Sequence, residues 1–249
     1  MQALIVLGTA GSGKTTFTAN FSRWLSDRVP LRVCSVNLDP GASFLPFDPS
    51  YDIRELISID HLMIEERLGP NGAMVRAAEL MVELSDEIAS SLLSLDCEYL
   101  IVDTPGQMEI FAFRPTGRVL CEKLARKLRI LSIYLGDYDP SREIEDLLSS
   151  ALLAKILELK LGVKVIPLLN KSDLWEGRDI ENLWNAALSG EVTIEGSGTY
   201  ADVLHELLRA ISSFRSPTRV IATSAKYGSG FEEVFDLMNE VWCSCGDLT

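Results

Sequence analysis

The chain has 249 residues, 47% of them hydrophobic and 24% charged, a composition typical of a globular protein that can bury a substantial core. Its formal net charge of −13 disfavours direct binding to nucleic acid, because an acidic surface repels a phosphate backbone. The N-terminal apolar run lacks the basic lead-in of a signal peptide, and charges interrupt the longest later run, so we expect a cytoplasmic protein without a membrane span.

Short apolar runs alternate along the chain with longer helical patterns, which predicts an α/β fold with a mostly parallel sheet flanked by helices. Most runs are apolar at every position, as strands covered on both faces are. The expected strands are Ala3–Leu7, Arg32–Asn37, Tyr99–Asp103, Arg129–Leu135, Lys164–Leu169 (short or bent at Pro167) and Arg219–Thr223. The expected helices are Lys14–Ser26, Ala73–Leu93, Ser141–Leu161 with Ser141 as a cap, and Phe231–Trp242.

A glycine-rich segment joins the first strand to the first helix. Residues 8–15 read Gly-Thr-Ala-Gly-Ser-Gly-Lys-Thr, which matches the phosphate-binding pattern G-x-x-x-x-G-K-[ST] in its strand–loop–helix context. The backbone N–H groups of such a loop and the helix N-terminus form a cradle for phosphate. We expect Lys14 to reach the β- and γ-phosphates and the Thr15 hydroxyl to bind Mg²⁺. The residues expected to contact the nucleotide here are Gly11, Ser12, Gly13, Lys14, Thr15 and Thr16.

The stretch from Asp39 to Asn71 interrupts the alternation of strands and helices. It is rich in Pro, Asp and short apolar runs, and is expected to hold two short helical turns at most. By residue type alone, Asp39-Pro40-Gly41 and Gly69-Pro70-Asn71-Gly72 are ordinary turn sequences. Asn71 also lies where a helical pattern begins, which makes it a candidate N-cap.

A second phosphate element follows the strand that ends at Asp103. The sequence there is Asp-Thr-Pro-Gly-Gln, and a carboxylate at the end of a buried strand is suited to bind Mg²⁺ directly or through water. Gly106 has no side chain to keep its N–H from a γ-phosphate. Gln107 is a candidate to orient the attacking water, with Glu109 near enough to help.

Two later strand ends indicate which base is bound. Asn170-Lys171-Ser172-Asp173 fits the pattern N-K-x-D, in which the aspartate accepts both the N1–H and the amino group of guanine, a pair of donors that adenine lacks. Asn170 is expected to brace the loop and the Lys171 stem to lie along the base. Ser224, Ala225 and Lys226 follow the next expected strand, where a backbone amide could bind the guanine oxygen. A surface insertion is expected between these elements, at about 176–197.

The five cysteines are scattered and odd in number, which favours reduced thiols. Cys243 and Cys245 invite a metal interpretation, but a structural zinc site needs about four ligands, and His61 and His205 have no cysteine near them in sequence.

With these motifs in this order, the chain resembles the GPN-loop GTPases. The namesake residues are Gly69, Pro70 and Asn71, between the phosphate loop and the sequence Asp103 to Glu109, and residues 243–249 look like the end of an archaeal member. The resemblance covers essentially the whole chain. It implies one domain over residues 1–249, a P-loop NTPase of the SIMIBI-type G-domain class with helical insertions, the GPN-loop insertion spanning roughly 44–95.

The resemblance also implies a partner and further roles. It implies a homodimer in which the GPN loop of each subunit reaches the partner's nucleotide site, so that Asn71 acts in trans. Asp39 matches the switch aspartate of the family, which acts on Mg²⁺ or on the attacking water. Eukaryotic members are linked to the assembly of RNA polymerase; the client of this chain is unknown.

The expected reaction is in-line attack of water on the γ-phosphate of GTP, giving GDP and phosphate. Transition-state stabilisation would come from the loop amides, Lys14 and Mg²⁺. Two alternatives remain: a dimeric P-loop ATPase of the partitioning or metal-insertion type, and an assembly factor in which GTP binding matters more than hydrolysis. No arginine finger is evident, and Arg114 and Arg118 are interpreted as solvated helix charges.

Overall fold

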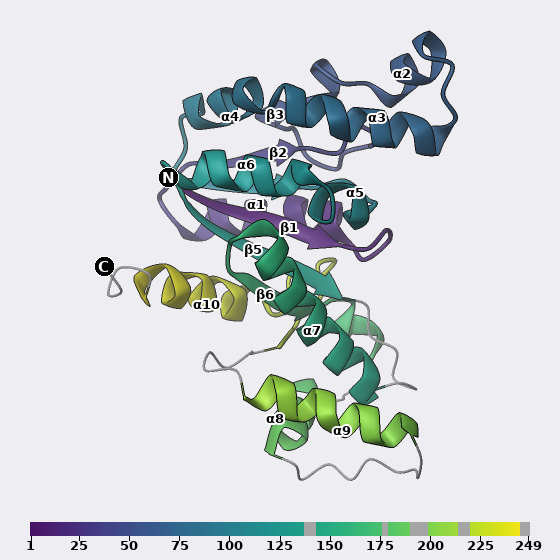
Figure 1. The fold of residues 1–249 in the computed structure, drawn as a ribbon. Coiled ribbons are helices and arrows are strands. Elements are labelled where there is room, and N and C mark those ends of the chain that lie inside the picture. Colours follow the sequence, from purple (N-terminus) through teal and green to yellow (C-terminus); the bar gives the residue numbers. More distant parts are fainter. Residues whose placement is uncertain (137–142, 176–178, 190–198, 214–219, 245–249) are drawn as a thin grey trace.

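A sheet of seven parallel strands forms the centre of the computed structural model, which describes residues 1–136, 143–175, 179–189, 199–213 and 220–244. The strand order is β3-β2-β4-β1-β5-β6-β7 (Figure 1). The strands are β1 (Gln2–Gly8), β2 (Val33–Asn37), β3 (Tyr51–Asp52), β4 (Tyr99–Asp103), β5 (Arg129–Gly136), β6 (Val165–Leu169) and β7 (Ile221–Ala222). The predicted parallel α/β fold is confirmed.

Helices cover both faces of this sheet, and one group extends beyond β6 and β7 (Figure 1). Their bounds are α1 (Lys14–Arg28), α2 (Ile59–Glu65), α3 (Pro70–Glu83), α4 (Ser85–Ser94), α5 (Met108–Ala112), α6 (Pro115–Ala125), α7 (Glu143–Leu161), α8 (Ile180–Ser189), α9 (Thr199–Ser212) and α10 (Phe231–Ser244). Two 3-10 turns, Ile53–Glu55 and Ser172–Leu174, follow β3 and β6. None of the helices in the described ranges combines the length and the apolar content needed to cross a lipid bilayer.

The central strand β1 is buried on both faces, which explains its unbroken apolar sequence. Ala3, Ile5 and Leu7 pack into a cluster that includes buried residues of α3, α4 and α6. The alternate residues Leu4 and Val6 face a cluster built from α1 and α10. That second cluster is rich in stacked and edge-on aromatic rings, among them Phe17, Phe21 and Phe231, with Trp24 packed against them. A third cluster joins α7 to α8 and α9.

Two expectations about the helix after the GPN sequence are wrong. The single helix predicted over Ala73–Leu93 is two helices, because Leu84 leaves helical geometry at φ −91° and ψ 12°. The apolar period continues across this break, with Met81 and Ile88 both buried, so periodicity alone does not reveal it. The N-cap of α3 is Gly69 rather than Asn71, since Pro70 occupies the first helical position, where its missing N–H costs nothing.

The stretch from Asp39 to Asn71 holds a 3-10 turn and the short helix α2, as expected, and also the two-residue strand β3, which the sequence did not predict. β7 pairs with β6 only at Leu168 and Leu169, after Pro167. The expected cap Ser141 lies outside the described residues, as do 176–178 and 190–197 of the expected surface insertion. The helix α8 in between buries Ile180 and Trp184, and so contributes to the core.

Candidate functional site

The motifs that the sequence analysis assigned to nucleotide binding meet at one edge of the sheet. The phosphate loop follows β1, Asp39 follows β2, and the Asp-Thr-Pro-Gly-Gln segment follows β4. Asn170 follows β6 and Ser224 follows β7. Because all seven strands run in the same direction, these loops all leave the carboxyl edge, where open α/β sheets bind ligands.

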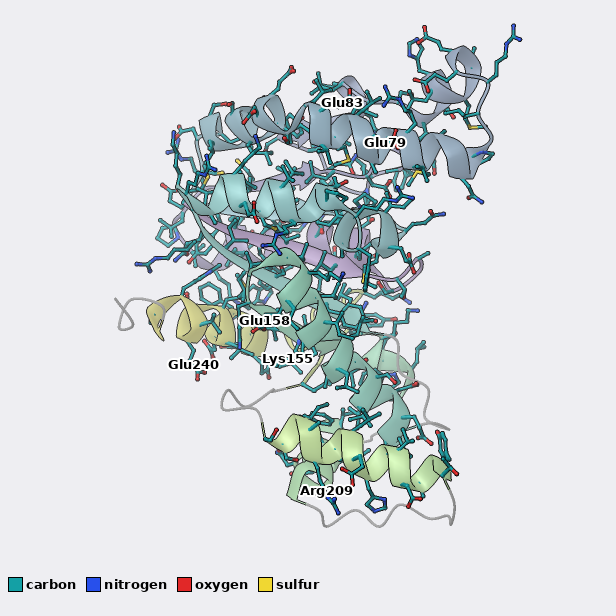
Figure 2. All side chains as sticks on the ribbon, in the orientation of Figure 1. Glu79, Glu83, Lys155, Glu158, Arg209 and Glu240 are labelled. Atoms are coloured by element: carbon teal, nitrogen blue, oxygen red, sulfur yellow. The ribbon has the colours of Figure 1, made fainter. Side chains whose placement is uncertain are left out.

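The charged groups labelled in Figure 2 belong to helices and not to these loops. Lys155 and Glu158 lie on α7 and are 3.6 Å apart, and Glu79 and Glu83 on α3 both pair with Arg76. These pairs lie within helices and are partly or largely exposed, so we treat them as helix-stabilising contacts.

The phosphate loop has the backbone conformation that its glycines predict. Gly11 and Gly13 have φ values of 79° and 96°, in the left-handed region that glycine adopts without strain. Gly13 is also the N-cap of α1, so the helix N-terminus faces the loop. The buried Lys14 donates from Nζ to the carbonyl oxygens of Gly8 and Thr9, at 2.9 and 2.8 Å. Its ammonium group is thus held over the loop.

Asp103 is a buried carboxylate beside the phosphate loop. It is 1% exposed, and neither Oδ atom has a hydrogen bond of ordinary geometry among the described residues. Burial raises the pKa of Asp103 to about 7, although the Thr15 hydroxyl and the Lys14 charge both lower it. Two buried carboxylate oxygens next to a threonine hydroxyl are oxygen ligands of the kind that a hard divalent cation prefers. The residues present therefore fit the expected Mg²⁺.

Asp39 connects the loop after β2 to the loop after β4. Its Oδ1 accepts the N–H of Gly41 at 2.9 Å, and its Oδ2 accepts the N–H of Gly106 at 3.0 Å. Gln107 is exposed and is the N-cap residue of α5, and Glu109 lies exposed in the first turn of that helix. Asp39, Gly106, Gln107 and Glu109 are therefore brought to the same edge as the phosphate loop.

Asn170 joins the phosphate loop to the loop after β7. Its Nδ2 donates to the carbonyl oxygen of Ser12 at 2.8 Å, and its Oδ1 accepts the N–H of Ala225 at 2.9 Å. The side chain is 2% exposed, so it braces the loops as predicted, from inside the protein. A Cβ atom on Gly13 would come within 2.5 Å of Asn170 Nδ2, so glycine is required there for this contact.

The predicted base-recognition residues lie together. Asp173 is exposed, and its Oδ1 accepts the hydroxyl of Ser224 at 2.6 Å. Lys171 adopts a left-handed conformation, with φ 69°, that starts the 3-10 turn carrying Asp173. The N–H groups of Ser224 and Ala225 are bonded to Ser229 and Asn170, and Lys226 is exposed beside the ring of Tyr227. The Ser224 hydroxyl thus holds one oxygen of an aspartate that remains exposed to solvent.

Asn71 and its neighbours in the GPN sequence differ from the buried residues of the other motifs, because they are exposed to solvent. Gly69, Pro70 and Asn71 are exposed at the start of α3, and in the part of the chain that the structure describes no hydrogen bond joins residues 69–71 to the phosphate loop of the same chain. The next turn of α3 does approach the site, since a Cβ on Gly41 would lie 3.3 Å from Met74 Sδ. Asn71 therefore begins a helix packed beside the Asp39 loop but faces outward.

The candidate arginines do not enter the site. Arg114 is the exposed N-cap residue of α6, and Arg118 pairs with Glu122 one turn later at 2.8 Å. The described cysteines, Cys34, Cys97, Cys121 and Cys243, are free thiols, and no cluster of three potential metal ligands of the His, Cys, Asp and Glu types occurs in the described ranges.

Sequence reasoning missed three residues that surround Asp39. Asn37 binds the N–H and the carbonyl oxygen of Asp39, and Arg54 donates to the carbonyl oxygen of Ala42. The Asp52 carboxylate accepts hydrogen bonds from both of these side chains. The available signal was Asn37, a polar residue closing an apolar strand; nothing local indicated that Asp52 would lie next to it.

Comparisons with known proteins identify the family of this chain. A family model described as a conserved hypothetical ATP-binding protein matches residues 6–244. The GPN-loop GTPase PAB0955 of Pyrococcus abyssi is 35% identical over 257 residues, with 99% of both chains covered. GPN-loop GTPase 1 of Dictyostelium discoideum is 30% identical, with 94% of this chain and 59% of the relative covered. A crystal structure of PAB0955, a GTPase in apo form, matches with a TM-score of 0.83 and 32% identity, covering 98% of both chains.

The description of the family model mentions ATP, whereas these relatives are named as GTPases. The Asn170-Lys171-Ser172-Asp173 sequence, with its exposed aspartate, agrees with the latter. The predicted resemblance is confirmed: this chain belongs to the GPN-loop GTPases and is a GTP-hydrolysing enzyme.

Proposed function

We propose that this enzyme is a Mg²⁺-dependent homodimer that works in the cytoplasm as a nucleotide switch. GTP hydrolysis converts its GTP-bound form to its GDP-bound form. The metal dependence is supported by the buried oxygens of Asp103, which make no hydrogen bond of ordinary geometry with the described residues. Thr15 and Asp103, with Asp39 beside them, would hold the ion. When bound, Mg²⁺ supplies positive charge that offsets the charge developing on the phosphate oxygens.

The residues of the chain account for the remaining steps of hydrolysis. The loop amides from Gly11 to Thr16 bind the phosphates, and Lys14 leaves its carbonyl partners to contact the β- and γ-phosphate oxygens. Gly106 donates its N–H to the γ-phosphate. Gln107, Glu109 and Asp39 then orient a water in line with the bond that breaks.

The proposed dimer explains the outward position of Asn71. An exposed Asn71 contributes little to its own site, whereas a second subunit could receive it at its phosphates. A symmetric dimer would complete both sites with the same pair of surfaces. Assembly of other proteins is the proposed output, because loops that sense the γ-phosphate at a subunit interface change shape upon hydrolysis.

The experiment is phosphate release from GTP and from ATP, with Mg²⁺ or with a chelator, over a range of protein concentrations. We expect release from GTP only, dependent on Mg²⁺, with specific activity that rises with concentration until the dimer is complete. Equal use of ATP would favour the P-loop ATPase alternative, and activity unaffected by chelation would refute the metal assignment.

Asn71 acting in trans has its own test. Asn71→Ala should slow turnover while GDP affinity stays unchanged, and Asn182→Ala, an exposed asparagine on α8, is the matched control. Mixing Lys14→Ala with Asn71→Ala subunits should restore about a quarter of the activity, since half the dimers are mixed and each holds one complete site of two. No restoration would show that Asn71 does not act across the interface.

A further inference from the structure

A hydrogen-bonded frame outside the nucleotide motifs holds the backbone of Asp39. The side chain of Asn37 is fully buried, and its Oδ1 accepts the N–H of Asp39 at 3.0 Å. Its Nδ2 donates to the carbonyl oxygen of Asp39 at 3.2 Å and to Asp52 Oδ1 at 2.8 Å. One amide therefore binds both backbone groups of Asp39 and fixes them relative to Asp52.

Arg54 holds the other end of the same loop. Its Nε lies 3.0 Å from both carboxylate oxygens of Asp52, and its Nη2 donates to Oδ2 of the same carboxylate at 2.5 Å. Its Nη1 donates to the carbonyl oxygen of Ala42 at 2.8 Å. Because the Ala42 N–H donates to the Asp39 carbonyl oxygen at 3.3 Å, residues 39–42 are held at both ends.

The frame exists because β3 pairs with β2. The parallel register places Asn37 directly opposite Asp52, which brings together residues that are fifteen apart in the chain. Asp52 then caps the 3-10 turn by accepting the N–H of Arg54, and this turn directs the guanidinium toward the loop. The two-residue strand β3 therefore joins the Asp39 loop to the Asp52–Arg54 ion pair.

The Asp52–Arg54 ion pair is largely shielded from solvent. The Asp52 side chain is 11% exposed and that of Arg54 is 34% exposed. Burial raises the pKa of Asp52, but the hydrogen bonds from Arg54 and Asn37 outweigh this and lower it below its ordinary value. Removing Arg54 would leave a poorly solvated carboxylate beside the loop, and the loop would have to move to accommodate it.

We propose that Arg54 and Asp52 are positioning residues for GTP hydrolysis, holding the backbone of residues 39–42 so that the Asp39 carboxylate stays within reach of the attacking water when the γ-phosphate takes the Gly106 N–H. This inference rests on the proposed role of Asp39. Arg54 is not an arginine finger in this arrangement, because its guanidinium is engaged by Asp52 and Ala42 rather than directed at the phosphates. Its effect on the reaction passes through the backbone of the loop.

The test measures kcat and KM for GTP, together with GDP affinity and thermal stability, for Arg54→Met and Arg54→Lys. Displacing a loop that orients the attacking water should lower kcat of Arg54→Met by about tenfold to a hundredfold, with KM and GDP affinity within about twofold. Arg54→Lys should recover part of kcat, since a lysine can reach Asp52 or the Ala42 carbonyl but not both. Arg32→Met is the matched control: Arg32 also pairs with two carboxylates, Asp96 and Glu98, just before β2 at the opposite edge of the sheet.

A double-mutant cycle shows whether Arg54 acts through Asp39. In an Asp39→Ala background, Arg54→Met should cause no further loss of kcat, because the group it positions is gone. An equal loss in both backgrounds, or an Arg54→Met kcat within about twofold of wild type, would overturn the inference. Asp39→Ala with wild-type kcat would instead refute the proposed role of Asp39.

If Arg54→Met does not fold, Asp52→Asn decides the question. The asparagine keeps an oxygen for Asn37 but loses the charge that holds the guanidinium. We expect a several-fold fall in kcat that disappears in the Asp39→Ala background. A wild-type kcat in Asp52→Asn would overturn the inference.

Discussion

Asp39 Oδ2 accepts the backbone N–H of Gly106 at 3.0 Å, which connects the loop after β2 to the loop after β4. The proposed reaction places a γ-phosphate oxygen on that same N–H. One N–H group serves one acceptor well, and a carboxylate also repels a phosphate, so the two compete for Gly106. A bound γ-phosphate would therefore displace Asp39, which is then available for Mg²⁺ or water.

This competition predicts opposite effects of Asp39→Ala on binding and on turnover. We expect kcat to fall about tenfold or more, because the group that orients the water is lost. The affinity for a non-hydrolysable GTP analogue, divided by that for GDP, should rise, because only the analogue carries the competing group. Calorimetric titration of both nucleotides measures the ratio, and a lower ratio would show that Asp39 does not compete.

Asp173→Asn should change the base that is preferred. The exposed carboxylate is expected to accept two donors of guanine, and asparagine replaces one acceptor with a donor, so GTP affinity should fall about a hundredfold or more. Xanthosine triphosphate should gain affinity, because its base offers an acceptor there. The Ser224 hydroxyl can still bond to the asparagine oxygen, so folding is retained. Wild-type GTP affinity in the variant would refute the assignment.

Asn170→Ala should destabilise the protein as well as weaken nucleotide binding. It leaves the carbonyl oxygen of Ser12 and the N–H of Ala225 without their side-chain partner in a buried place. Each such group costs about 1–3 kcal/mol, so the free energy of unfolding should fall by about 2–6 kcal/mol. Denaturant titration measures it. The exposed control Asn182→Ala should lose less than about 1 kcal/mol.

Asp103→Asn should abolish hydrolysis and yet stabilise the protein that lacks nucleotide and metal. The pKa of Asp103 is raised by burial to about 7, so the folded chain holds a proton that the unfolded chain releases near pH 4. The wild type therefore loses stability as pH rises through this window and stays at the lower level above it. Asparagine carries no such charge, so at pH 8 the variant should be more stable, by up to about 4 kcal/mol.

Thermal unfolding of both proteins from pH 5 to pH 8 provides the check. The difference in melting temperature should grow with pH and level off above pH 7. A constant difference across this range would show that the Asp103 carboxylate does not titrate in it.

The sequence alone determined the fold class and the position of the nucleotide motifs. Each motif follows an apolar run, and in a parallel sheet every such run ends at the same edge whatever the strand order. Lys14, Asp103 and Asp173 could therefore be assigned to one site without knowing which strands are neighbours. The same local reasoning placed α3 and α4 in one helix, because a single residue outside helical geometry, Leu84, leaves the apolar period unchanged.

Only the tertiary structure decided what holds these motifs in place. Asn170 bonds to the carbonyl oxygen of Ser12, 158 residues away, and Asn37 meets Asp52 only because β3 pairs with β2 in one register. The raised pKa of Asp103 likewise depends on its burial among strands. Contacts of this kind depend on strand register and packing between distant segments, and no pattern of neighbouring residues encodes either.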